Sequence, residues 1–328
     1  MGASVVSASS AEDASQEGEA PLKPVDAALT IPRGVAQVDF QSSYWTGLLF
    51  IIALFVGGWQ FGVFGLLGTV TATLTAYLLG ITKDRVSMGL EGFNGTLIGV
   101  GLVLYLGADW MTVALVIGAA VAGSVLTSAM NTVLTPYNLP TFTAPFCVVT
   151  TVVVLGAPSF ERLWSGAPDL PPPSAADPGT AMSWSDFWRG SFNGVGQVFF
   201  QDKWYVGLIF LAGLAVASRL VAAAAFVSSV IGLLVGWWFG AQAADLGAGL
   251  YGYNPVLTGI ALTGTFVLLS RAGVVYAVIG AATAAGLTAG LTDLFDVLGG
   301  HTLTWPFVLV SWVFLAAVPL FSNLRRAP

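Results

Sequence analysis

The chain has 328 residues, of which 56% are hydrophobic and only 9% are charged, and its mean hydropathy is +0.83. Soluble domains carry about 25% charged residues, so this composition excludes an ordinary soluble protein. No charged residue lies between Asp39 and Lys83 or between Asp109 and Glu161, and roughly 20 apolar residues span a bilayer. The net charge of −6, without a basic patch, argues against a nucleic-acid partner. We therefore predict an all-α polytopic protein in a lipid bilayer.

The chain begins with a small, polar and acidic stretch that lacks the apolar core of a cleaved signal peptide. Its composition predicts a disordered tail over residues 1–33. Residues 157–189, which include three consecutive prolines and several acidic residues, predict a polar linker. Residues 323–328 follow the last apolar span as a short C-terminal segment.

The two apolar regions contain the same phrases. Those of the first region and their copies are "GVAQVDFQ" (34–41) and "GVGQVFFQ" (194–201), "GLEGFNGTL" (89–97) and "GLYGYNPVL" (249–257), and "TFTAPF" (141–146) and "TLTWPF" (302–307). Three phrases in one order, offset by 160 or 161 residues, predict an internal duplication with repeats over 34–156 and 190–322. Such duplications are common in transporters and channels.

Each repeat divides into five apolar spans. They are 45–62, 64–82, 96–108, 110–130 and 140–156, then 204–219, 221–241, 256–270, 273–292 and 302–322. A short Gly-rich segment precedes the third span, and broken backbone exists at membrane depth only against protein or a water-filled path. We therefore expect one re-entrant pore half-helix per repeat at these segments. Because five is an odd number of crossings, the second repeat must be inverted.

The basic residues predict the orientation. With a cytoplasmic N-terminus, ten crossings place more basic residues inside than outside, as the positive-inside rule requires. The inner residues are Lys23, Arg33, Lys83, Arg85, Arg219, Arg271, Arg325 and Arg326, and the outer residues are Arg162, Arg189 and Lys203. Both termini are therefore expected in the cytoplasm.

Taken together, the duplicated motifs resemble those of the urea transporter family over about residues 34–156 and 190–322. The resemblance identifies the chain as a bacterial member, located in the inner (cell) membrane. It implies a homotrimer in which each protomer holds a central pore between its inverted repeats. It also implies passive, channel-like permeation of urea down its gradient. Some members carry Glu at one of the two duplicated glutamine positions; here both are Gln, which removes a charge from one vestibule.

Urea is flat, neutral and small, so its passage requires hydrogen-bond acceptors and a narrow slot rather than charge. Dehydrating its N–H groups costs several kcal/mol in an apolar setting unless acceptors replace the water. Because the last carbonyls of a helix lack intrahelical partners, the broken segments are expected to present a ladder of backbone carbonyls. These segments are Phe93-Asn94-Gly95 and Tyr253-Asn254-Pro255. The two asparagines either contact the solute or brace the broken backbone.

The remaining candidate pore residues come in pairs, one from each repeat. Phenylalanine rings form flat slots, valines narrow them and glutamines stand at the entrances, while the resemblance implies that leucines line the opposite wall and threonines face the midpoint. The pairs are Phe40 and Phe200, Val38 and Val198, Gln37 and Gln197, Leu97 and Leu257, and Thr143 and Thr304. A single phenylalanine or leucine would more simply indicate helix packing, but its symmetric recurrence favours a pore.

Three further residues have no repeat partner of the same type. Glu91, the one carboxylate of the Gly-rich segments, lies at the cytoplasmic mouth or bonds a neighbour. His301 is a helix-end or interface residue in preference to a proton relay. Cys147 is a packed small side chain. A single histidine and a single cysteine make no metal cluster, and we expect neither metal nor cofactor.

Three other functions compete with a urea channel. Ion-coupled transport of a small neutral amide requires buried ionisable groups, and beyond Glu91 the pore motifs contain none. A membrane enzyme is not expected, because HExxH, GxSxG and Cys/His clusters do not occur. A pore for ammonia or water stays open as an interpretation, since a path that passes urea also admits smaller molecules.

Overall fold

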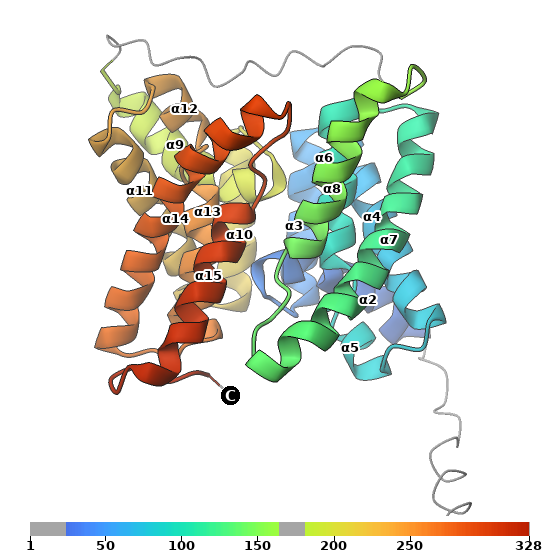
Figure 1. The fold of residues 1–328 in the computed structure, drawn as a ribbon, viewed down its shortest axis with the longest axis horizontal. Helices are drawn as coiled ribbons and strands as arrows, with labels where there is room; N and C mark the ends of the chain where they lie inside the picture. Colours follow the sequence, from blue (N-terminus) through green and yellow to red (C-terminus); the bar gives the residue numbers. More distant parts are fainter. Residues whose placement is uncertain (1–23, 164–180, 328) are drawn as a thin grey trace, which may run out of the picture.

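The computed structural model describes residues 24–163 and 181–327; the predictions for residues 1–23 and 164–180 lie outside the described residues. Within these ranges the regular structure is helical, apart from an isolated bridge between Val267 and Arg326. Figure 1 shows the helices of the first repeat, in blue and green, beside those of the second, in yellow and red. The prediction of an all-α fold is confirmed.

Helices of the two halves follow each other in the same order. The first half has α2 (Pro24–Ala36), η2 (Gln37–Asp39), α3 (Tyr44–Gly57), α4 (Trp59–Leu78), α5 (Lys83–Ser87), α6 (Phe93–Leu106), α7 (Trp110–Leu134), η3 (Thr135–Tyr137), α8 (Ala144–Gly156) and η4 (Ala157–Ser159). The second has α9 (Trp184–Gly196), η5 (Gln197–Phe199), α10 (Trp204–Ala217), α11 (Arg219–Trp238), α12 (Ala243–Ala248), α13 (Tyr253–Ile260), η6 (Ala261–Thr265), α14 (Arg271–Val297), α15 (Trp305–Ala317) and η7 (Val318–Leu320). Each predicted span overlaps one of these helices.

Helix extends into two segments that composition assigned to the tail and the linker. Helix α2 begins at Pro24 and α9 begins at Trp184, so the predicted boundaries at 33 and 189 are wrong. Both helices are amphipathic, and a polar face lowers the average hydrophobicity of a segment without preventing a helix. In α9 a capping box also sets the start, because Ser183 and Asp186 bond each other's backbone N–H groups.

The helices that correspond to the ten predicted spans are unequal in length. Among the described residues, α4, α7 with η3, α11 and α14 are long and apolar enough to cross a membrane alone. Helices α6 and α8 have only 14 and 13 residues, which corresponds to about 20 Å. The α2–η2 segment meets α3 at 79° and the α9–η5 segment meets α10 at 71°.

These bends relocate the predicted break in the backbone. Phe40 and Phe200 have left-handed φ values of 61° and 59° and end η2 and η5. By contrast, Phe93 and Tyr253 are the first residues of α6 and α13. A helix start leaves N–H groups unpaired, not carbonyls, so the carbonyl ladder predicted at Phe93-Asn94-Gly95 and Tyr253-Asn254-Pro255 is wrong.

The glycines that suggested a break serve turns and close packing instead. Gly89 has a φ of 80°, in the turn before α6. A Cβ on Gly95 would lie 2.2 Å from the backbone oxygen of Gly68, so α4 and α6 touch backbone to backbone. Glycine frequency alone does not distinguish this close approach from a re-entrant loop.

A kink after α13 accounts for the change in offset between the two copies from 160 to 161. The second repeat has one more residue between its Leu257 and Ser270 than the first has in the corresponding segment. In η6 the N–H of Phe266 donates to the oxygen of Ala261 at 2.9 Å, five residues earlier. Thr263 (φ −110°, ψ 82°) and Gly264 (φ 85°, ψ −14°) leave helical geometry here, so the kink takes up the extra residue. Phe266 therefore becomes the counterpart of Tyr105.

Helices α3 and α10 join the two halves. The Thr46 hydroxyl donates to the oxygen of Gly213 at 2.9 Å, and Lys203 Nζ donates to the oxygen of Gly57 at 2.8 Å. The ring of Phe50 in α3 lies 4.9 Å from that of Phe210 in α10. The core is thus continuous between the halves.

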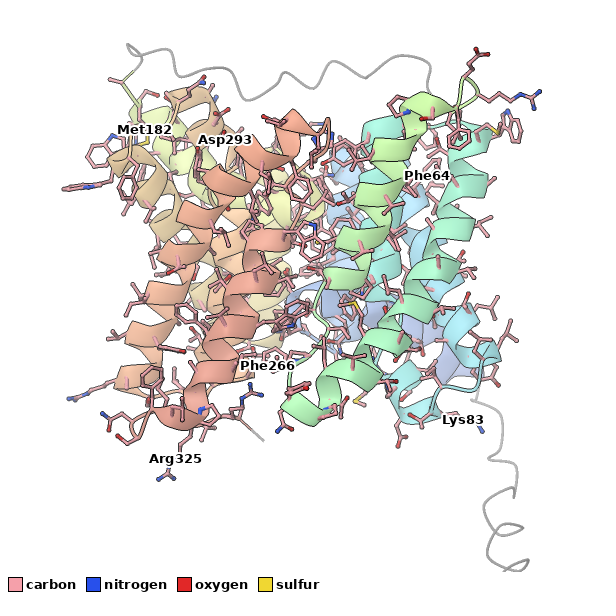
Figure 2. All side chains as sticks on the ribbon, in the orientation of Figure 1. Phe64, Lys83, Met182, Phe266, Asp293 and Arg325 are labelled. Atoms are coloured by element: carbon pink, nitrogen blue, oxygen red, sulfur yellow. The ribbon has the colours of Figure 1, made fainter. Side chains whose placement is uncertain are left out.

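Equivalent elements lie at opposite ends of the molecule. In Figure 1, α2 and α5 are near the lower edge, whereas their counterparts α9 and α12 are near the upper edge. Figure 2 shows Lys83 and Arg325 at the lower end and Asp293 at the upper end. Lys83 and Arg325, both assigned to the inner side from the sequence, thus share one end, while the orientation in a membrane stays a prediction.

Candidate functional site

Two duplicated threonines meet in the interior between the halves. Thr143 is the N-cap of α8 and Thr304 is the N-cap of α15, and their hydroxyl oxygens are 2.6 Å apart. The Sγ atom of Cys147 lies 3.1 Å from the Thr304 hydroxyl. From this contact α8 runs to the upper end and α15 to the lower end (Figure 1). Two helix N-termini, each with a partial positive charge, therefore converge on one buried point.

The duplicated asparagines hold these helix starts in place. Each side-chain oxygen accepts the N–H of the motif phenylalanine, and each side-chain nitrogen donates to a carbonyl just before the helix. The partners are Phe146 N (3.1 Å) and Phe142 O (3.4 Å) for Asn94, and Phe307 N (3.1 Å) and Leu303 O (3.4 Å) for Asn254. Of the two interpretations of these asparagines, bracing agrees with the observed bonds.

Phe40 belongs to a cluster of four phenylalanine rings. Its ring centroid is 5.9 Å from that of Phe142, 5.5 Å from that of Phe266 and 6.1 Å from that of Phe307. Phe266 and Phe307 come from the second half of the chain, so both halves build this Phe40 cluster. In Figure 2 its member Phe266 lies toward the lower end.

Phe200 lies in the equivalent cluster, which has different members. Its ring is 6.0 Å from that of Tyr105 and 6.1 Å from that of Phe146, both in the first half. His301 stacks on Tyr105, with 4.1 Å between the ring centroids and 7° between the planes. This Phe200 cluster therefore contains a phenol and an imidazole where the Phe40 cluster has hydrocarbon.

The duplicated glutamines are anchored in the same way. Gln37 Nε2 donates to the oxygen of Met88, and Gln197 Nε2 donates to the oxygen of Ala248, both at 3.0 Å. Each bond ties a Gln-Val-x-Phe phrase to the turn before α6 or α13. With the nitrogen engaged, the amide oxygen is the atom that can accept a further hydrogen bond.

The predicted apolar residues and Glu91 are all buried. The predicted apolar residues are Val38, Val198, Leu97 and Leu257. Glu91 is 4% exposed, and its Oε1 accepts from Arg85 Nε at 2.8 Å. Of the two interpretations of Glu91, a bond to a neighbour agrees with the structure.

Sequence reasoning missed Asp39. It lies inside the Gln-Val-x-Phe phrase and is fully buried, and neither carboxyl oxygen has a hydrogen-bond partner among the described residues. Its counterpart is Phe199, whose ring stacks on Phe210 at 4.4 Å. The available signal was a carboxylate at a position where the second copy has an aromatic ring.

The apolar helices and the duplicated motifs define, as a class, a multi-pass helical membrane protein. Residues 28–319 match the profile of the urea transporter family, and the chain belongs to this family. The resemblance seen in the motifs is thereby confirmed. The family is one of transporters, in agreement with the expectation that the chain is not an enzyme.

Curated relatives include urea transporter 1 of Ovis aries, 30% identical over 246 residues, and urea transporter 1 of Mus musculus, 29% identical over 248 residues. Each match covers 73% of this chain. The chain spans 63% of the length of the sheep protein and 64% of the length of the mouse protein.

Proposed function

We propose that this protein conducts urea passively across a membrane, through a pore between its two halves. The pathway runs from the Phe40 cluster, past the contact between Thr143 and Thr304, to the Phe200 cluster. The observation that carries the proposal is the symmetry of these groups. Two equivalent aromatic clusters, each built from both halves, accompany one shared pair of hydroxyls.

The proposed architecture is two inverted repeats of five crossings each. In the first repeat the crossings are α3, α4, α6, α7 and α8, while α2 enters part of the way and turns back at Phe40. Elements α9, α10, α11, α13, α14 and α15 have the equivalent roles. The 79° and 71° bends support a re-entrant role for α2 and α9, and the opposite positions of α2 and α9 support inversion (Figure 1).

The slots act on the shape of urea. We propose that its flat face slides along the ring of Phe40 or Phe200, with N–H groups able to approach the ring face. Val38 and Val198 narrow the two slots, and Leu97 and Leu257 form the opposite walls. A slot lined in this way excludes bulky and charged solutes because it offers them neither width nor compensation for lost water.

Acceptors along the path replace the water that urea loses. The amide oxygens of Gln37 and Gln197 stand at the two entrances. The carbonyl ladder moves, by the helix-end argument, from the Gly-rich segments to the phrases that end at Phe40 and Phe200. At the midpoint the threonine hydroxyls donate to the urea oxygen or accept from its nitrogens.

The assembly and location follow the family resemblance. We propose a homotrimer with one pore per protomer, in a bacterial inner membrane, with both termini in the cytoplasm. Large apolar side chains on the outer faces of the long helices, such as Leu74, Ile117, Leu234 and Val275, are exposed in the single chain. Lipid or a neighbouring protomer would cover them.

One observation favours ion-coupled transport as a second candidate. The unpartnered carboxyl of Asp39 lies one residue from Phe40, and buried ionisable groups in membrane proteins often bind protons or ions. If Asp39 couples transport to an ion, its replacement by Asn abolishes gradient-driven uptake. In a passive channel, the Asp39→Asn protein still conducts urea, and the rate does not depend on an ion gradient.

Urea efflux from proteoliposomes tests the proposed function. We expect flux well above that of protein-free vesicles, saturating with urea concentration and unchanged when sodium or proton gradients are imposed or collapsed. Strict dependence on either gradient would overturn the passive channel in favour of the coupled alternative. Parallel measurements of water and ammonia permeability show whether smaller molecules share the path.

A further inference from the structure

The two aromatic clusters differ in their capacity to hydrogen-bond. The repeat register pairs Tyr105 with Phe266 and His301 with Pro140. At the Phe40 cluster these positions carry hydrocarbon, whereas at the Phe200 cluster they carry a hydroxyl and two ring nitrogens. At these two positions, therefore, the Phe200 cluster carries polar ring atoms that the Phe40 cluster lacks.

Packing fixes the positions of these polar atoms. The ring of Tyr105 is 7% exposed and lies 6.0 Å from that of Phe200. His301, in the loop between α14 and α15, is half-buried and lies parallel to the Tyr105 ring at 4.1 Å. The stacked rings of Tyr105 and His301 pack beside Phe200, which limits their movement. A solute can therefore bind to their polar atoms without rearrangement of these side chains.

Burial favours the neutral form of the His301 imidazole. Burial lowers the pKa of its imidazole below the usual 6.5, and Asp296 of α14 raises it to a smaller degree. Among the described residues, the other titratable groups on the elements at this mouth include Tyr105 of α6, Cys147 of α8, Asp293 of α14 and Tyr253 of α13, whose hydroxyl donates to the oxygen of Leu303 at 2.9 Å. A neutral imidazole has one donor and one acceptor nitrogen.

We propose that Tyr105 and His301 form a hydrogen-bonding subsite for planar amides at the Phe200 mouth, and that His301 determines which solutes this mouth accepts. The Tyr105 oxygen and the unprotonated imidazole nitrogen accept N–H groups of urea while its face lies on Phe200. The inference rests on the proposed function. It assigns the stronger selection among amides to the Phe200 mouth and leaves the Phe40 mouth as a shape filter.

Substitution of each ring tests the subsite in the full-length chain. Tyr105→Phe copies the residue at the other mouth, and His301→Phe keeps a stacked ring but removes its nitrogens. The loss of one hydrogen bond to the solute raises the urea concentration for half-maximal flux about three- to tenfold. N,N′-dimethylurea, which has fewer N–H groups, is affected less, so discrimination between the two solutes falls.

Two further variants separate the subsite from general disturbance of the fold. His301→Gln retains an acceptor and is expected to keep half-saturation within about twofold of the wild type. Tyr137→Phe removes a phenol oxygen from an exposed site on η3. It is expected to change neither the half-saturation for urea nor the discrimination between urea and N,N′-dimethylurea. The melting temperature of each purified variant reports on its folding.

The pH profile gives an independent readout. Because protonation removes the acceptor nitrogen of His301, urea flux in the wild type should fall as the pH drops below the depressed pKa of this imidazole. His301→Gln and His301→Phe should show no such fall between pH 7.5 and 5, a window chosen to bracket the usual histidine range.

The outcomes distinguish this inference from the proposed function. Folded Tyr105→Phe and His301→Phe proteins with wild-type half-saturation and an unchanged pH profile would overturn the subsite while the channel stands. If wild-type protein passes no more urea than empty vesicles do, the proposed function fails and the subsite fails with it. A raised half-saturation in both variants, with Gln rescue at His301, supports the subsite.

Discussion

Thr143 and Thr304 illustrate what a single residue contributes. Each is almost fully buried, and each hydroxyl has the other within 2.6 Å. A hydroxyl both donates and accepts, so the pair can exchange its mutual bond for bonds to a passing amide without leaving a polar atom unsatisfied. This property makes the pair suited to a buried midpoint where water is scarce.

The double substitution Thr143→Val with Thr304→Val removes both hydroxyls and keeps the side-chain shape. Two lost hydrogen bonds to the solute, each about 1 kcal/mol, correspond to a reduction in urea flux of roughly tenfold or more. Stability should change little, because both partners of the mutual bond are removed together and the remaining partner, Cys147, has only a weak S–H donor. Stopped-flow light scattering on proteoliposomes measures the flux.

Thr132→Val, which removes an exposed hydroxyl on α7, is the matched control and should leave the flux unchanged. Wild-type flux in the double variant would show that the two hydroxyls lie outside the solute path.

Residue types and their recurrence predicted the pore pairs, but not how each side chain is used. The bracing bonds of Asn94 depend on Phe146 and Phe142, which lie about fifty positions further along the chain. The burial of Asp39 likewise depends on distant packing. A side chain's partner is a tertiary property, so the sequence left the asparagines with two interpretations and overlooked the aspartate.

At the scale of elements, the contact between α4 and α6 shows how glycine sets the distance between helices. The backbone oxygen of Gly68 occupies the space that a Cβ on Gly95 would need. Backbone cannot rotate away as a side chain can, so a methyl group here must push the helices apart. Small residues allow such close approach between membrane helices.

Gly95→Ala should therefore lower stability by about 1–3 kcal/mol, the typical cost of overpacking. Gly118→Ala is the matched control on α7, where nothing lies near the position of the new methyl group. It should be neutral or stabilising by up to about 1 kcal/mol, since alanine favours helix. Melting temperatures of the detergent-solubilised proteins measure both effects. Equal melting temperatures for the two variants would refute the packing argument.

The existence of these helices was predictable, because apolar runs of sufficient length form helices in a membrane. The positions of the breaks between helices were not predictable. The Gly-rich segment before Phe93 and the phrase before Phe40 both interrupt an apolar pattern; the second joins two apolar helices at a bend of 79°, whereas the first leads into the start of α6. The choice depends on which neighbouring backbone each glycine meets, and that neighbour is distant in sequence.

At the scale of the whole molecule, the positions of individual charged residues indicate an orientation in the membrane. Figure 2 places Lys83 and Arg325 at one end and Asp293 at the other. Basic residues are retained on the cytoplasmic side during insertion. The Phe40 mouth should therefore face the cytoplasm, and the Phe200 mouth should face outward.

Cysteine labelling tests this orientation on a Cys147→Ala background, which removes the chain's one natural thiol. Asp84→Cys and Arg325→Cys should react with a membrane-impermeant maleimide only in inside-out vesicles. Asp293→Cys should react in intact cells. All three native residues are exposed, and Asp293 lies near the C-terminal end of α14, so labelling does not require unfolding. Reaction of Arg325→Cys in intact cells would contradict cytoplasmic termini.

By itself, the sequence determined the class of the protein, its duplication, its family and most of the candidate pore residues. These follow from composition and from repeated phrases, which are properties of the linear chain. Only the tertiary structure decided where the backbone turns, which amides act as braces, and that the Phe200 cluster contains Tyr105 and His301 whereas the Phe40 cluster contains phenylalanine rings. Those outcomes depend on contacts between residues far apart in the chain, because burial and hydrogen bonding are set by the partner that folding brings near.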